Sequence, residues 1–306
     1  MTPGRLLAYF WLQKVTRIIW QKSAICYIYK MNLYLKKIKP TQPAHDSADD
    51  LPAVVILHGL YGSGANWHNV ARIIADTLGQ DVYTLDLPNH GHSGWTERFS
   101  YSSVTEDVLG WLRENPEKFP AGIVFLGHSL GGRVAMISAA RSEDIRGLAM
   151  ADISPFTDSK QDRIITLVHG MLLHRMLEAK EQGVKDKDID SHLREQGVDM
   201  SAMGSLRQPY SQMNLEVVAD KVMGLLPDYL YIHTHEDYGR LRNLPTLFIR
   251  GGVDSMYIPQ AAVDNLSSRF DNYRVTTVEG TTHNLYNEKS PEVAIAFTEW
   301  YSANFC

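Results

Sequence analysis

The chain has 306 residues, of which 44% are hydrophobic and 10% aromatic, so it can bury a sizeable core and is not a disordered chain. It carries 30 Lys and Arg against 35 Asp and Glu, and the resulting net charge of −5 argues against a protein that binds nucleic acid through a broad basic surface. The mean hydropathy is −0.23, and no apolar run is long enough to predict a membrane-spanning segment. The two cysteines, Cys26 and Cys306, make no disulfide framework, which favours a cytoplasmic protein.

The first thirty residues differ from the rest because they carry basic side chains, while the first acidic residue of the chain is Asp46. Three interpretations fit this composition: an extension outside the fold with translation starting at Met31, a surface amphipathic helix, and a mitochondrial targeting segment. We expect residues 1–30 to be an extension outside the core. A mitochondrial location follows only if this segment is a genuine presequence.

Short apolar and β-branched runs recur along the chain and predict the strands of one sheet. A short first strand is expected within 32–39, followed by strands at 53–57, 81–85, 122–126, 147–151, 246–249 and 274–278. The run 53–57 is continuously apolar, as in a strand buried on both faces, whereas 274–278 alternates and is expected nearer an edge. Helical patterns lie between the runs, which is typical of βαβ units and a mostly parallel sheet flanked by helices.

The interval between the runs 147–151 and 246–249 is much longer than the others. Residues 155–243 are charged, rich in Met and helical in pattern, and a structureless loop of that length is implausible in a compact domain. We therefore expect residues 155–243 to form a helical lid, inserted into a core made of residues 31–154 and 244–306. Candidates for an adaptable apolar roof of that lid are Met171, Leu172, Met176, Met203 and Met213.

Residues 127–131 read Gly-His-Ser-Leu-Gly, which is a G-x-S-x-G pattern centred on Ser129. The pattern alone is weak, but here it follows a predicted strand and opens a predicted helix at 133–140. That strand–turn–helix context is what a nucleophile elbow requires, because the tight turn lifts the serine hydroxyl above the edge of the sheet. Ser129 is therefore the candidate nucleophile.

A nucleophilic serine needs a base, and His283 is the best placed of the twelve histidines. It follows the last predicted strand, and imidazole exchanges protons near neutral pH. The order of serine first and histidine last is that of α/β hydrolases. The backbone N–H groups of Leu60, in the loop after the first core strand, and of Leu130 are the candidates for an oxyanion hole.

Four sequence blocks carry a resemblance to a known family: LHGLYGSGANW, LDLPNHGHS, LGHSLGGRVAM and ADISP. Together they resemble the small α/β-hydrolase esterases of the YbfF type, with their related mitochondrial hydrolases and fungal ethanol acetyltransferases. The resemblance is dense from 54 to 155, returns at LFIRGG and EGTTH, and is thin across the predicted lid. It implies an α/β-hydrolase fold and cleavage of an acyl ester or thioester, with acetyl transfer to an alcohol as a variation.

The sequence leaves two candidates for the acid of a catalytic triad. In the resembling family the acid lies in the ADISP block, which points to Asp152. Asp254 follows the next core strand, which is the commoner position across α/β hydrolases, whereas the resembling family usually carries Ser or Asn there. Both positions lie on the carboxyl edge of the sheet, so either acid could reach His283. We favour Asp152 and keep Asp254 as the alternative.

The sequence thus predicts a serine esterase or thioesterase, for which acyl-CoA is a possible substrate, with a small-molecule acyl ester or thioester as its partner. An alcohol acyltransferase using the same triad, a carbon–carbon bond hydrolase and a non-catalytic binding protein are the alternatives. No cofactor is expected, because side chains and water suffice for this chemistry. No metal is assigned either: His233 and His235 lie beside Glu236, but no third ligand stands at a recognisable spacing from the two histidines. The oligomeric state is not readable from the sequence.

Overall fold

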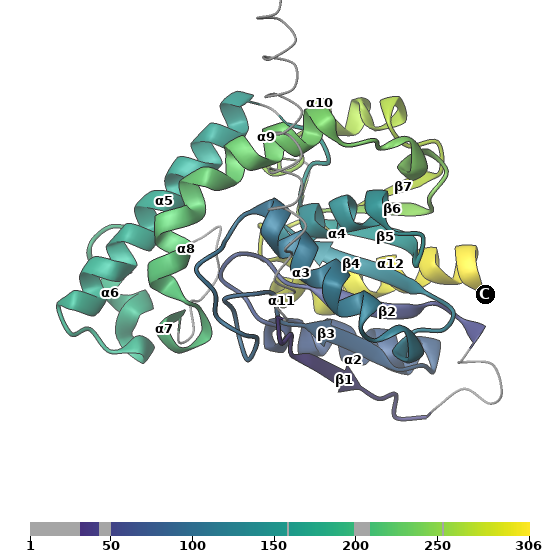
Figure 1. Cartoon of the computed structure of the whole chain (residues 1–306), viewed down its shortest axis with the longest axis horizontal. Helices are drawn as coiled ribbons and strands as arrows, with labels where there is room; N and C mark the ends of the chain where they lie inside the picture. Colours follow the sequence, from purple (N-terminus) through teal and green to yellow (C-terminus); the bar gives the residue numbers. More distant parts are fainter. Residues whose placement is uncertain (1–30, 43–49, 158, 199–208, 253) are drawn as a thin grey trace, which may run out of the picture. The chain divides into compact units, whose positions relative to one another are not determined.

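The computed structural model describes residues 31–42, 50–157, 159–198, 209–252 and 254–306, so the predicted extension 1–30 lies outside the described residues. Seven strands form one sheet in the order β1-β3-β2-β4-β5-β6-β7 (Figure 1). They are β1 (Leu35–Ile38), β2 (Ala53–Leu57), β3 (Val82–Leu85), β4 (Ile123–His128), β5 (Ile145–Ala151), β6 (Thr246–Arg250) and β7 (Tyr273–Thr277). Edge strand β1 pairs antiparallel with β3, and the other pairs are parallel. The predicted strands are confirmed, and β7 lies at an edge as its alternation indicated.

Helices cover both faces of the sheet, because alternate residues of each strand point to opposite sides. In β2, Val55 and Leu57 pack into a cluster with α3 (Tyr101–Arg113) and α4 (Leu130–Arg141). Val54 and Ile56 pack on the other face with α2 (His68–Leu78) and α12 (Ser290–Phe305). All four β2 side chains are fully buried, which is why this strand reads as a continuous apolar run.

Local sequence signals set the ends of the flanking helices. The Ser100 side chain accepts a hydrogen bond from the N–H of Ser103 and so caps the start of α3. Helix α2 ends at Gly79, whose φ of 66° favours glycine. The remaining short elements of the core are η2 (Gly64–Trp67), η3 (Pro116–Lys118), α10 (Gln260–Asp264), η7 (Leu266–Ser268) and α11 (Leu285–Glu288).

The described residues between β5 and β6 form helices that group to one side of the sheet (Figure 1). They are α5 (Ser159–Glu181), η4 (Asp186–Asp188), α6 (Ile189–Glu195), α7 (Pro209–Gln212), α8 (Leu215–Lys221), η5 (Val222–Gly224), α9 (Leu225–His235) and η6 (Gly239–Arg242). Asp228 of α9 ties this insertion to the core, because its carboxylate accepts hydrogen bonds from the N–H and the hydroxyl of Ser102 at 2.8 and 2.6 Å. Within the described residues, no helix has the length and apolar character needed to cross a membrane.

Candidate active site

Ser129 lies at the turn between β4 and α4, with φ of 51° and ψ of −118°. A positive φ is strained for any residue other than glycine. A Cβ on Gly131 would lie 2.5 Å from the carbonyl oxygens of Leu57 and His58, and one on Gly127 would collide with the backbone of Gly131. Glycine is therefore required on both sides of Ser129, as a nucleophile elbow demands.

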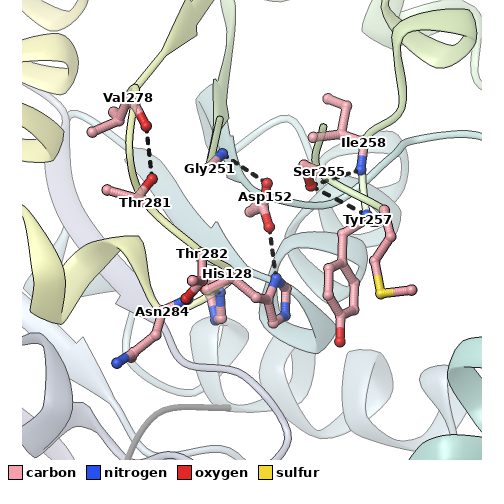
Figure 2. Close-up of polar contacts among 12 residues, drawn as sticks. His128, Asp152, Gly251, Ser255, Tyr257, Ile258, Val278, Thr281, Thr282 and Asn284 are labelled. Carbon is pink, nitrogen blue, oxygen red and sulfur yellow. Dashed lines mark hydrogen bonds and ion pairs between the residues drawn. The ribbon is translucent and has the colours of Figure 1, made fainter. Parts of the chain in front are cut away.

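The structure brings His283 and Asp152 together, because His283 Nδ1 lies 2.8 Å from Asp152 Oδ2. The N–H of Gly251 donates to Asp152 Oδ1 at 2.8 Å (Figure 2). Asp152 follows β5, is 1% exposed and has a φ of 47°. Burial raises the pKa of Asp152, but the hydrogen bond and charge of His283, with the Gly251 N–H, leave that pKa below its usual value. The ionised carboxylate can therefore orient the imidazole with its Nδ1–H toward Asp152.

Asp254, the alternative acid, lies in the loop after β6 and is exposed. Among the described residues, no hydrogen bond or ion pair involves its carboxylate. The same edge of the sheet thus carries both candidate acids, as the strand ends predict, but it is Asp152 that contacts His283.

Tyr257 contacts His283 and lies beside the same cavity as Ser129. The ring of Tyr257 stacks on that of His283 with ring centres 3.4 Å apart, and Tyr257 lines the same cavity as Ser129. In the described part of the chain, no hydrogen bond joins the Ser129 hydroxyl to His283. This contact is often long in free enzymes and shortens when substrate binds.

Leu60 and Leu130, the two predicted oxyanion residues, line one cavity with Ser129. Leu130 is the first residue of α4, so its N–H is one of the helix donors that have no partner within the helix. Leu60 lies in the loop after β2, and its carbonyl oxygen accepts a hydrogen bond from Nε2 of the buried His90. His90 therefore fixes the peptide that follows Leu60 and steadies this loop.

The sequence analysis assigns no role to His90 or His128, although both make contacts at the site. His128 Nε2 donates to the carbonyl oxygen of His283 at 2.8 Å, and the two rings lie 4.5 Å apart. Burial, together with the neighbouring His283, lowers the pKa of His128 to about 3, so its imidazole is neutral. The available signal was its position directly before Ser129.

A cavity of about 50 Å³ adjoins Ser129 between the core and the insertion. This volume has room for a few water molecules. Half of its fourteen lining residues come from the insertion: Asp162, Ile165, Thr166, His169, Val222, Leu225 and Leu226. The predicted methionine-rich roof is not among them, because Met171 points outward while Leu172, Met176 and Met213 are buried in packing. Met203 lies outside the described residues.

Two polar contacts join the insertion to the core at this cavity. Arg133 donates from Nη2 to Asp162 Oδ1 at 2.6 Å, and the two side chains are 7% and 9% exposed. The guanidinium of Arg133 lies over the ring of Tyr229, 4.1 Å from its centre. The hydroxyl of Tyr61 lies 2.9 Å from His169 Nδ1. The cavity therefore has polar as well as apolar walls.

The described residues contain no group of three or more His, Cys, Asp or Glu side chains arranged to hold a metal ion. His233, considered above as a ligand, has its ring nitrogens 3.3 and 3.4 Å from the guanidinium of Arg269.

Residues 52–290 match the α/β hydrolase fold family. The chain belongs to this family. The mouse sn-1-specific diacylglycerol lipase ABHD11 is 27% identical over 267 residues, which cover 83% of this chain and 82% of that protein. Ethanol acetyltransferase 1 of Wickerhamomyces anomalus is 24% identical over 274 residues, covering 82% and 68%. A solved marine microorganism esterase shares the α/β hydrolase fold with a TM-score of 0.63 at 23% identity, covering 88% and 99%. These relatives confirm the resemblance drawn from the sequence blocks.

Proposed function

We propose that the protein is a serine hydrolase that cleaves carboxylic esters through an acyl-enzyme on Ser129. The family and the named lipase relative identify the chain as an ester-bond hydrolase. The finer proposal is supported above all by the 2.8 Å contact between His283 and Asp152, beside a strained Ser129 that lines a cavity.

In the proposed first half-reaction, Ser129 Oγ attacks the acyl carbonyl carbon and its proton passes to Nε2 of His283. Asp152 accepts a hydrogen bond from the Nδ1–H of His283 and stabilises the imidazolium that forms. The N–H groups of Leu60 and Leu130 donate to the carbonyl oxygen as it becomes negative, and each such donor typically contributes about 2.7–4 kcal/mol. His283 then protonates the departing alcohol, which leaves the acyl group on Ser129.

In the second half-reaction, His283 takes a proton from water while the water oxygen attacks the acyl carbon. Collapse of the second tetrahedral intermediate breaks the bond to Ser129 Oγ, which recovers its proton from His283. The carboxylic acid is released and the enzyme returns to its starting state.

We further propose that residues 155–243 form a lid over this site. In support, the insertion supplies half of the residues that line the cavity, and α9 is tied to α3 by the hydrogen bonds between Asp228 and Ser102. Because the cavity is small, we expect a preference for short acyl groups.

Acyl transfer is the second candidate, favoured by the ethanol acetyltransferase relative. The same acyl-enzyme would be intercepted by an alcohol instead of water, and a lid that excludes water would favour this outcome. Thioesters such as acyl-CoA are the further candidate donors.

The decisive assay is hydrolysis of p-nitrophenyl esters from two to sixteen carbons by the wild type and by Ser129→Ala. We expect turnover by the wild type, fastest for short chains, and a rate at least ~10³-fold lower for the variant. Added ethanol then separates the two candidates by the ratio of ethyl ester to free acid. A wild type as inert as Ser129→Ala on every ester would overturn hydrolysis through Ser129.

The expected cytoplasmic location and the expected lack of nucleic-acid binding remain predictions. Fractionation of cells producing the full chain, and a gel-shift assay with mixed nucleic acids, test them directly.

A further inference from the structure

Helix α5 presents an apolar face that no described residue covers. Ile164, Leu167, Val168 and Met171 recur at helical spacing and are exposed, with Leu167 at 52% and Met171 at 69%. The opposite side of the helix points inward, where Ile165 lines the cavity beside Ser129. A helix that is apolar on both sides is normally buried on both. The outward side of α5 therefore lacks a partner within the described chain.

Two exposed methionines extend this face on either side of α5. Met256 lies beside the start of the helix, since the Gln161 amide donates to the Met256 carbonyl at 3.0 Å. Met223 lies beside its middle, since a Cβ on Gly170 would lie 2.8 Å from Met223 Sδ. We call the following residues the α5 apolar face: Ile164, Leu167, Val168, Met171, Met223 and Met256.

Basic side chains border the α5 apolar face at both ends of the helix. Lys160 and Arg163 flank one end, His174 and Arg175 flank the other, and all four are exposed. Acidic Glu178 lies 3.4 Å from Arg175 and 4.0 Å from His174, so it offsets part of the second group. With His174 neutral, Lys160, Arg163, Arg175 and Glu178 sum to +2, whereas the whole chain carries a net charge of −5.

These charges distinguish three candidate partners of the α5 apolar face: a second copy of the chain, the chain's own residues 1–30, and a lipid surface. A second copy of the chain packed through the same face would bring basic ends against basic ends, which is repulsive in a symmetric dimer. The chain's own residues 1–30 carry five basic side chains and no acidic one, so they meet the same repulsion. An anionic lipid surface instead attracts basic side chains and accepts apolar ones at its headgroup boundary.

We propose that the α5 apolar face docks on the surface of a bilayer that contains anionic lipid. Docking itself is independent of catalysis. Its consequence rests on the proposed function: because the inner side of α5 lines the cavity, docking would hold the cavity beside Ser129 one helix away from the bilayer, close to esters there whose short acyl group fits it.

The test is co-sedimentation of the full chain with vesicles of phosphatidylcholine, alone or with phosphatidylserine. We expect salt-sensitive binding to the anionic vesicles, weakened at least ~10-fold by the double variant Leu167→Asp, Met171→Asp. Arg163→Gln should weaken it by about fivefold while leaving the apolar residues intact. Ile295→Asp is the matched control, since Ile295 is also 52% exposed but lies on α12, and it should bind as the wild type does.

Three outcomes overturn the proposal. The first is absence of binding to anionic vesicles. The second is binding that the double variant leaves unchanged, which would assign it to the basic residues 1–30. The third is a dimer, seen by sedimentation velocity, that the double variant dissociates. Ser129→Ala should bind vesicles normally, so loss of the proposed catalytic function and loss of docking are separate results. Melting temperatures within a few degrees of the wild type show that each variant is folded.

Discussion

Two buried carboxylates lie near the cavity and are paired differently. Asp152, at the end of β5, contacts His283 at 2.8 Å, whereas Asp162, in α5 of the insertion, contacts Arg133 at 2.6 Å. Both carboxylates are more than nine-tenths buried. Distance and burial alone would therefore assign them the same role.

The two pairs differ in the partner of the carboxylate, which is His283 for Asp152 and Arg133 for Asp162. An imidazole gains and loses a proton near neutral pH, whereas a guanidinium remains charged throughout the working range. The pair of Asp152 with His283 can therefore serve proton transfer, while the pair of Asp162 with Arg133 is a fixed ion pair across the boundary between core and insertion. The same geometry supports chemistry in one region and attachment in the other.

The largest expected effect comes from removing the charge of Asp152. We expect Asp152→Asn to lower kcat by about 10⁴-fold, because the amide stabilises neither the imidazolium nor the required tautomer of His283. Asp254→Asn is the matched control and should retain activity near the wild-type level. The measurement is kcat on a short p-nitrophenyl ester, and equal mild losses in both variants would contradict the assignment of Asp152.

Removing the charge of Asp162 should instead lower the stability of the folded protein. Asp162→Asn leaves the Arg133 guanidinium buried beside a neutral amide, and breaking a buried ion pair typically costs about 3–5 kcal/mol of unfolding free energy. Asp271→Asn breaks the exposed pair with Arg242 and should cost about 0–1 kcal/mol. Urea denaturation of both variants measures the difference. If Asp162→Asn loses no more unfolding free energy than the control does, the pair of Asp162 with Arg133 contributes little to stability.

Acidification tests the buried histidines of the core and of the insertion together, because burial also lowers the pKa of His90, and lowers those of His169 and His233 to about 3 and about 4. Burial and the neighbouring His90 lower the pKa of His58 to about 4, and burial lowers that of His128 to about 3. In the unfolded chain both histidines bind protons below about pH 6.5, so unfolding takes up protons and stability falls as the pH drops from 6.5 toward 4. The slope is about 1.4 kcal/mol per pH unit for each histidine. Denaturation at pH 7 and pH 5 measures it, and equal stability at both values would refute buried neutral histidines.

Much of the core could be predicted because its signals are local. The strand 53–57 reads as buried on both faces, and the strand–turn–helix around Ser129 explains the glycines on either side. The sequence favours Asp152 over Asp254 only through the family resemblance, because both residues follow strands that end at one edge of the sheet. Which of them contacts His283 depends on how two loops fold back, and no local pattern encodes that.

The insertion was harder to predict for a related reason. The spacing of Ile164, Leu167, Val168 and Met171 is that of one side of a helix, and α5 forms there, but an apolar stripe usually marks the buried side of a helix. Helix α5 carries apolar residues on both sides, so the pattern could not show that this stripe points outward and that Ile165 faces the cavity. The methionine-rich roof is predicted from composition alone, and composition does not show in which direction a side chain points.

The smallest expected effect concerns the hydrogen bond from His128 Nε2 to the carbonyl oxygen of His283. His128→Gln can keep an N–H near the position of Nε2, whereas His128→Phe removes the donor to the His283 carbonyl. Loss of such a bond costs about 0.5–1.5 kcal/mol, so we expect kcat to fall up to about 10-fold in the Phe variant and less in the Gln variant. Both variants also remove one buried neutral histidine, so in both the acid sensitivity should fall by the share of His128, about 1.4 kcal/mol per pH unit. Equal kcat in the two variants, with that loss observed, would show that His128 packs beside His283 without positioning it. A lower kcat in the Phe variant alone would show that the orientation of His283, and not only its contact with Asp152, matters for the proton transfer that we propose.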